Sequence, residues 1–193
     1  MNRVFNAKSA NQYHGEITNR EHCEKVSELA EKFGTEIYKP NEAYIAGLFH
    51  DFGKYSDAFQ DVLNGKRQNI DHAFPGAAFL FANRKLYGIA GSNKWKDFEP
   101  IIESIAGHHD GLVSMGLKEN ALKITYESSS ADCCPSEKLP SLRGKDEFAL
   151  AKRAFREDFP EFSFTKPSPR TFENKVDDML DTRMLCLCVI KKQ

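Results

Sequence analysis

The segment AYIAGLFHDF, residues 43–52, is apolar on nearly every side of a helix, yet it contains a histidine and an aspartate. A helix of that composition has no face suited to water, so we expect it to form the buried centre of the fold. Pro40 and Asn41 precede it in the manner of a helix start, and Gly53 follows where the helix should end. His50 and Asp51 therefore lie in a core, where each polar group needs a partner.

Helical patterns dominate the rest of the chain. Thr18 and Glu21 have the spacing of a capping box, and Gly34 is placed to end the helix that follows. We expect helices between Thr18 and Gly34, from Pro40 to Gly53, from Ser56 to Gly65, over about 72–87, from near Pro100 to Gly111, over 117–126, over about 146–159 and over 171–189. Valine and isoleucine do not alternate, so strands are poorly supported.

These helices predict an all-α fold, a compact single-domain helical bundle over residues 1–193. Residues 91–97, GSNKWKD, read as a polar turn. Residues 127–145 are rich in Ser, Pro and Lys and lack periodicity, which is typical of a mobile surface loop.

The overall charge is balanced, with 27 basic and 28 acidic side chains. A protein that coats nucleic acid relies on clustered Lys and Arg, so any such binding here would come from a local patch or from bound metal. None of the five cysteines forms a C-x-x-C pair, and the longest apolar run, Met184 to Ile190, is too short for a bilayer. Without a signal-peptide pattern, the expected location is cytoplasmic, with no membrane partner.

The histidines are the most informative polar residues. Five of the six lie inside or at the mouth of apolar helices, namely His22, His50, His72, His108 and His109. A lone buried histidine is usually bonded to a carbonyl, but five desolvated imidazoles each need a partner, and a metal ion can serve several at once. The neighbours His50-Asp51 and His108-His109 could face one ion only where a helix end loosens.

The ligand types indicate which metal would suit the site. Imidazole nitrogens with a carboxylate favour Mn, Fe, Co, Ni or Zn, and suit Mg and Ca poorly. We therefore expect one or two divalent transition-metal ions. Asp51, beside His50, could bridge two of them, as carboxylates do in two-metal hydrolases.

The motifs around these residues resemble a known family. HDFGK at 50–54 is the signature of the HD superfamily of metal-dependent phosphohydrolases. The wider runs GLFHDFGKYSDAFQDVL, DHAFPGAAFL and IAGHHDGL are similar to the HD nuclease domain of the CRISPR type I interference nuclease-helicase. The likeness covers about residues 14–117, and its FQ-x-x-L, DHA and HHDGL elements are more specific than HD-x-G-K alone.

The resemblance implies a deoxyribonuclease, endo- or exonucleolytic, that hydrolyses single-stranded DNA in antiviral defence with a CRISPR-associated helicase and an RNA-guided surveillance complex. By the same analogy, one ion would be held by His22, His50 and Asp51, and Asp51 would bridge to a second ion held by His72, His108 and His109. Lys54 would stabilise the scissile phosphate, where a lysine ending a helix would otherwise lie at the surface.

The resemblance gives less support for assigning other polar residues to the metal site. Asp71 and Asp110 flank ligands and are interpreted as supporting or solvent-facing residues, and His14 matches no motif. Four basic residues could line a path for a DNA strand, but a solvated face is the favoured explanation for them: Arg84, Lys85, Lys94 and Lys96.

The sequence departs from the family pattern near its end. The family's last helix carries an arginine, a short apolar run and then an aspartate, whereas here Arg183 is followed by MLCLCVI and KKQ. Either the last helix is truncated or the aspartate has been lost, because Asp177, Asp178 and Asp181 come too early. Two alternatives therefore stay open: an HD phosphohydrolase for a nucleotide or cyclic nucleotide, and a metal-depleted, non-catalytic HD binding module.

Overall fold

The computed structural model describes residues 3–13, 15–36, 39–84, 92–109, 111, 115–129 and 138–162, with the side chains of 92–97 and 115–118 left out. The helices are α1 (Asn19–Thr35), α2 (Pro40–Phe49), the short 3-10 helix η1 (Phe52–Lys54), α3 (Asp57–Leu63), α4 (Ala73–Asn83), α5 (Ser92–Gly107), α6 (Met115–Glu127) and α7 (Gly144–Asp158). The strands are β1 (Asn6–Lys8), antiparallel to β2 (Ile17–Thr18), and β3 (Ile70–Asp71), parallel to β4 (Leu139–Pro140). The fold is all-α, as expected, with only short strands added.

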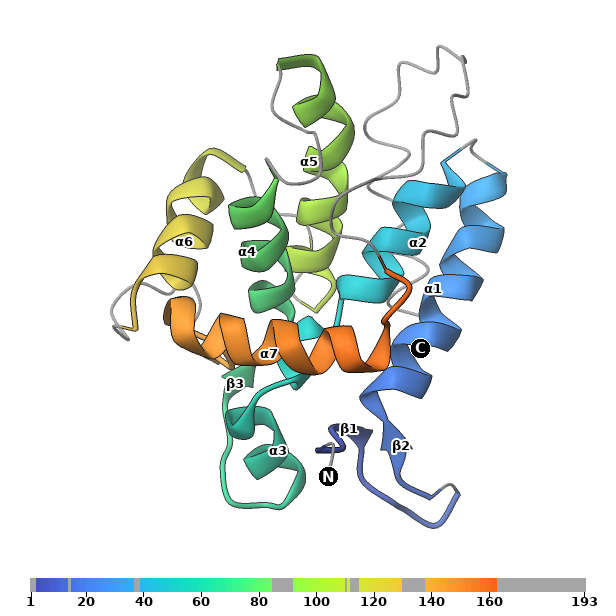
Figure 1. Ribbon diagram of the computed structural model, residues 1–193, viewed down its shortest axis with the longest axis vertical. Helices are drawn as coiled ribbons and strands as arrows, with labels where there is room; N and C mark the ends of the chain where they lie inside the picture. The colour runs from blue at the N-terminus through green and yellow to red at the C-terminus, as the bar shows by residue number, and fades with distance from the viewer. Residues whose placement is uncertain are drawn as a thin grey trace.

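The helices pack as neighbours in a bundle (Figure 1). Helix α1 lies along α2, and α4 packs against both α5 and α6. Helix α7 runs across the front of the bundle and contacts η1 and α6. Within the described residues, no helix is long and apolar enough to cross a bilayer.

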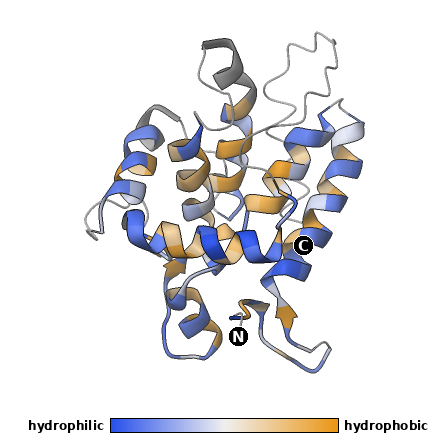
Figure 2. Ribbon diagram, in the orientation of Figure 1, coloured by the Kyte–Doolittle hydropathy of each residue, from blue (hydrophilic) through white to orange (hydrophobic). Residues whose placement is uncertain are grey.

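The core is built around aromatic rings that converge from four helices. Phe49 at the end of α2 stacks on Phe155 of α7 at 4.8 Å between ring centroids, and Phe52 of η1 stacks on Phe79 of α4 at 4.4 Å. These rings are fully buried, which confirms the prediction that residues 43–52 form the centre of the fold. Figure 2 shows the same pattern, with hydrophobic residues concentrated on α2, α4 and the lower part of α5.

Local signals at two helix starts are confirmed. The Thr18 hydroxyl accepts a hydrogen bond from the Glu21 amide at 3.2 Å, and the Glu21 carboxylate accepts one from the Thr18 amide at 3.0 Å. This reciprocal pair is the capping box expected from the sequence. Ser56 caps α3 by accepting from the Phe59 amide at 3.1 Å.

Helix α2 ends at Phe49 rather than at Gly53, which lies in η1. Three further expectations about boundaries are wrong. Gly34 does not end α1, which continues to Thr35; a Cβ at Gly34 would lie 2.7 Å from the Ala43 Cβ, so this glycine permits α1 and α2 to approach closely. Helix α5 begins at Ser92 rather than near Pro100, so the polar run 92–97 is helical. A run of polar residues is compatible with the outer turns of a helix.

The third correction concerns the loop expected at 127–145. Within it, residues 139–140 form β4, which pairs with β3, and Ser141 and Leu142 are buried. The segment is therefore partly a packed element, while 130–137 lie outside the described residues. The helix expected at 171–189, His14, Asp110, Lys85 and the C-terminal departure from the family pattern also lie outside them.

Candidate metal centre

Four helix ends meet at one end of the bundle, and each brings a histidine. Helices α1 and α4 begin there while α2 and α5 end there, which follows from their alternating directions (Figure 1). His22 lies in the first turns of α1, His50 directly follows α2, His72 directly precedes α4, and His108 directly follows α5. The expectation that the adjacent pairs sit where a helix ends is confirmed.

The residues expected as ligands gather into two clusters. We call His22, His50 and Asp51 the first donor group, and His72, His108 and His109 the second donor group; within each, the potential ligand atoms lie within 4.8 Å of one another. All six residues expected from the sequence are thus brought together, and the described residues add no further one to these clusters.

The Asp51 carboxylate lies between the histidines of the first donor group and those of the second, and Asp51 is 2% exposed. Its Oδ2 atom is 2.8 Å from His22 Nε2 and 3.0 Å from His50 Nε2. Its Oδ1 atom faces the second donor group, 3.3 Å from His72 Nε2 and 3.8 Å from His108 Nε2. One carboxylate therefore presents a different oxygen to each cluster.

The ring nitrogens within each group also approach closely. His22 Nε2 and His50 Nε2 are 3.2 Å apart, and His72 Nε2 and His109 Nε2 are 2.9 Å apart. Metal–ligand bonds of ~2.1 Å place neighbouring ligand atoms ~3.0–3.4 Å apart. The observed separations are those of donors arranged around a shared ion.

Backbone carbonyls orient two of the rings. His50 Nδ1 lies 2.7 Å from the Gly47 carbonyl oxygen, and His108 Nδ1 lies 2.8 Å from that of Ile105. An Nδ1–H that donates to a carbonyl leaves the Nε2 lone pair free to bind. Both Nε2 atoms face the Asp51 carboxylate, so these rings are held in the orientation that metal-binding histidines usually have.

The protonation states favour metal binding. Burial is the main cause that lowers the pKa of His22 and of His109, and burial followed by the charge of His50 lowers that of His108 well below its ordinary value. Burial alone would raise the pKa of Asp51, but the charges of His50 and Lys54 and hydrogen bonds from the two nearest histidines hold it well below the usual range. A lowered pKa favours the neutral form of these three imidazoles and the ionised form of the Asp51 carboxylate, which are the forms that bind a metal.

One polar atom in the cluster is not satisfied by the protein. Among the described residues, Asp51 Oδ1 is buried and makes no hydrogen bond. An orphaned carboxylate oxygen is costly in a core. This oxygen lies beside the imidazoles of His72 and His108, where a metal ion could bind it, so the donor set as a whole fits the ions expected from the sequence.

Lys54 is buried rather than at the surface, so the alternative of a surface lysine is wrong. Its Nζ lies 2.7 Å from Asp51 Oδ2 and donates to the Ala7 carbonyl oxygen at 3.4 Å. The ammonium also lies 5.1 Å from the centroid of the Phe59 ring, and that ring meets His72 edge to face at 4.8 Å. A cation is therefore held beside the shared carboxylate.

Two residues outside the ligand set support the site. The Asp71 carboxylate accepts from the Ala73 and Phe74 amides at 2.8 and 3.1 Å, which caps α4 beside His72. The sequence leaves Asp71 as a supporting or solvent-facing residue, and an aspartate just before an apolar helical run is a recognisable start signal. Ser141 donates to the Gly53 carbonyl oxygen at 2.7 Å, and no local pattern around it indicates that contact.

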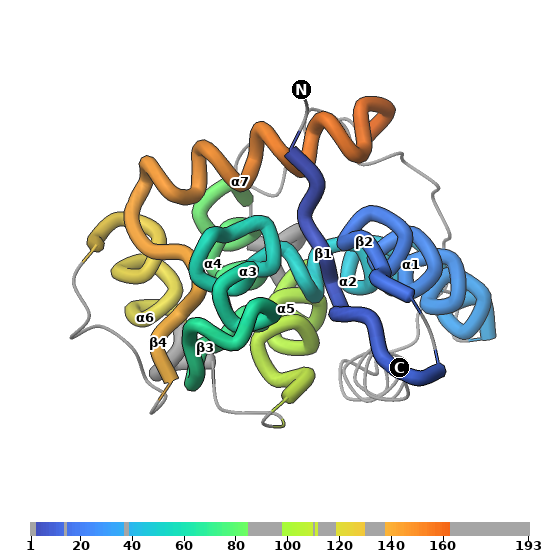
Figure 3. Tube along the Cα trace, turned by 90° about the horizontal axis from the view of Figure 1, so that it is seen from below, coloured from blue at the N-terminus to red at the C-terminus, as the bar shows by residue number. Residues whose placement is uncertain are grey.

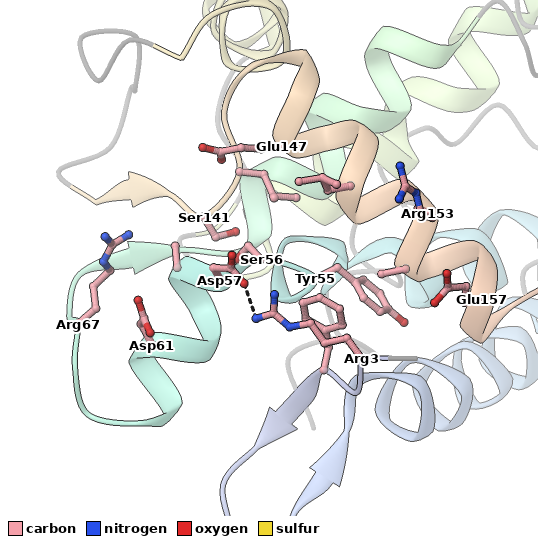
Figure 4. A pocket seen from close by; sticks show the side chains of 15 residues that line it. Arg3, Tyr55, Ser56, Asp57, Asp61, Arg67, Ser141, Glu147, Arg153 and Glu157 are labelled. Atoms are coloured by element: carbon pink, nitrogen blue, oxygen red, sulfur yellow. Dashed lines mark ion pairs between the residues drawn. The ribbon is translucent and has the colours of Figure 1, made fainter. Parts of the chain in front are cut away.

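A separate pocket of about 510 Å³ lies between α7, α3 and the N-terminal segment (Figure 4). None of the six candidate ligands lines it. Its charged residues oppose one another, as in the ion pair between Arg3 and Asp57. The pocket therefore has no single charge that would select a ligand, and it is distinct from the histidine cluster.

A helical bundle whose helix ends place five histidines around one buried aspartate has the features of a metal-dependent hydrolase. The family model for the HD domain matches residues 19–146, and the chain belongs to this family. Membership implies metal-dependent phosphohydrolase activity in general. Neither the search of curated proteins nor that of solved structures found a match.

Proposed function

We propose that this protein is a metal-dependent nuclease that hydrolyses phosphodiester bonds of single-stranded DNA, acting with a CRISPR-associated helicase and an RNA-guided complex. The observation that carries the reaction type is the Asp51 carboxylate, which presents Oδ2 to one set of histidines and Oδ1 to another. The nucleic-acid substrate and the partners rest on the resemblance of the FQ-x-x-L, DHA and HHDGL elements.

The arrangement supports a site for two ions. A one-ion phosphohydrolase for nucleotides would need the first donor group alone, and the second donor group would then bind no metal. The second donor group instead lies around an unsatisfied carboxylate oxygen. When bound, divalent ions at such a site neutralise phosphate charge and lower the pKa of an attacking water.

The protein's own residues have separate roles in this proposal. Asp51 and the five histidines would hold the ions, and the buried His50 and His108 are fixed through their Nδ1 hydrogen bonds. Lys54 holds a positive charge beside the shared carboxylate, where it can stabilise the negative charge that develops on a phosphate. His109 and His72 are the more exposed ligands, so substrate would approach from their side.

Substitution of the shared carboxylate tests the proposal. Asp51→Asn keeps the shape of the side chain but removes its charge, so bound metal measured by mass spectrometry and cleavage of a labelled single-stranded oligonucleotide in Mn²⁺ or Ni²⁺ should fall together. Asp57→Asn, which alters an exposed carboxylate in the same region, should change neither.

The substrate panel separates the alternatives. Duplex DNA, RNA, nucleoside monophosphates and cyclic nucleotides are assayed beside single-stranded DNA. Preferential hydrolysis of a nucleotide or cyclic nucleotide would favour the phosphohydrolase reading over the nuclease. Metal binding without hydrolysis of any of these substrates would favour the non-catalytic binding module.

A further inference from the structure

Strand β1 crosses the end of the bundle that carries the histidine cluster, between α3 and α1 (Figure 3). Besides its pairing with β2, it is bound by the side chain of Gln60 on α3. The Asn6 amide donates to Gln60 Oε1 at 3.1 Å, and Gln60 Nε2 donates to the Asn6 carbonyl oxygen at 3.0 Å. The glutamine amide thus bonds to β1 as a neighbouring strand would.

The same amide reaches the lysine of the site. Gln60 Nε2 also donates to the backbone carbonyl oxygen of Lys54 at 3.1 Å. The Lys54 ammonium in turn donates to the carbonyl oxygen of Ala7, the residue after Asn6, at 3.4 Å. Gln60 therefore bonds both to the backbone of Lys54 and to β1, the strand whose Ala7 carbonyl accepts a hydrogen bond from the Lys54 ammonium.

We propose that Gln60 is a positioning residue that holds the Lys54 ammonium beside Asp51 Oδ2. A lysine side chain has a flexible four-carbon stem, so a single ion pair fixes it poorly without a second anchor. Here the second anchor is the Ala7 carbonyl, whose place depends on the bonds between β1 and Gln60. This proposal assigns a role to Gln60, the glutamine of the FQ-x-x-L element. Gln60 binds no metal in the proposed function.

A double-mutant cycle tests whether Gln60 acts through Lys54. Gln60→Met keeps the length of the side chain and removes all three hydrogen bonds. It should lower kcat for single-stranded DNA about tenfold when Lys54 is present and less than about twofold in the Lys54→Ala background, because coupled residues are not additive. Equal losses in both backgrounds would show a merely structural role and overturn the proposal.

Two further variants sharpen the cycle. Ser9→Ala removes the hydrogen bond from the Ser9 hydroxyl to the Leu63 carbonyl oxygen, another link between the N-terminal segment and α3 that does not involve Lys54. It should leave kcat unchanged. Gln60→Glu keeps the acceptor for the Asn6 amide but loses both donated bonds, so it should behave like Gln60→Met. Circular dichroism and thermal unfolding establish that each variant is folded.

Because the kinetic cycle rests on the proposed function, a second readout does not need catalysis. The Lys54 ammonium opposes a divalent ion at Asp51 Oδ2, so Lys54→Ala should tighten Mn²⁺ binding measured by calorimetry. Gln60→Met should tighten it in the same direction only while Lys54 is present. If the parent hydrolyses no phosphodiester, the proposed function fails, and the Mn²⁺ affinities alone decide the role of Gln60: coupling supports it, and additivity overturns it.

Discussion

The Nε2 atoms of His72 and His109 lie 2.9 Å apart, although the two residues are 37 positions apart in the sequence. His72 precedes α4, and His109 follows α5. Two imidazole nitrogens at this distance cannot both present lone pairs to each other, so either one of them carries a proton or a metal ion lies between them. A proton can fill that place in the metal-free protein and a metal ion in the loaded one. A metal ion that binds both nitrogens must therefore displace the proton from Nε2.

The two donor groups should bind metal unequally. Asp51 Oδ1 makes no hydrogen bond to the described residues, whereas Oδ2 already contacts two histidines and the Lys54 ammonium. Calorimetric titration of metal-free protein with Mn²⁺ should therefore show a tight event at the second donor group and a weaker one at the first. His72→Ala should remove the tight event, and His22→Ala the weak one. Two equally tight events in the parent would contradict this inequality.

Lys54 should matter for rate rather than for metal content. Lys54→Ala removes a buried cation beside the shared carboxylate, which also competes with the metal at Asp51 Oδ2. We expect bound metal to be maintained or increased while the rate of DNA cleavage falls ~10²–10³-fold, as for a lost electrostatic donor. Lys66→Ala, at an exposed position after α3, is the matched control. An unchanged rate would leave Lys54 with a structural role only.

The metal-free protein should lose stability in mild acid. The folded-state pKa values of His22, His108 and His109 lie below 6.5, the ordinary value, so the unfolded chain binds more protons below about pH 6.5. The free energy of unfolding in urea should thus fall as the pH is lowered from about 7 to about 5. His108→Asn should reduce this slope, and a flat profile in the parent would be the contrary result. The lowered pKa of Asp51 acts in the same direction, but only in stronger acid.

Gly53 should tolerate no side chain. A Cβ there would lie 2.3 Å from the His72 carbonyl oxygen and 2.6 Å from Ser141 Oγ. Gly53→Ala should therefore lower the free energy of unfolding by about 2–3 kcal/mol through overpacking, and should weaken metal binding by displacing His72. At Gly15 an added Cβ would meet nothing within 4 Å, so Gly15→Ala should change stability by less than about 0.5 kcal/mol. Equal stability of the two variants would show that the turn can relax.

The sequence was most informative where structure is local. The capping box at Thr18, the proline start of α2 and the apolar composition of 43–52 each depend on a few neighbouring residues, and each is found in the structure. The clustering of the histidines was also predictable, because buried imidazoles need partners and helix ends are where adjacent residues can face one point.

Long-range packing limited the rest. Whether Gly34 ends a helix or admits a neighbouring one depends on Ala43 of α2, and a single sequence does not distinguish these uses of glycine. The pairing of β3 with β4 joins residues about seventy positions apart through two residues each, too short for any periodicity. Gln60 was noticed as part of a motif, but its bonds to Asn6 depend on where β1 passes.

The hydroxyl groups of Ser56 and Ser141 both donate to the carbonyl oxygen of Gly53, at 2.8 and 2.7 Å, and Ser141 lies 88 positions further along the chain. During synthesis all six candidate ligands are therefore made before Ser141, the residue that completes this turn. Closing so long a loop is slow compared with forming the helices. A nascent chain thus carries its whole ligand set some time before Gly53, and the neighbouring Asp51, are held by this last contact.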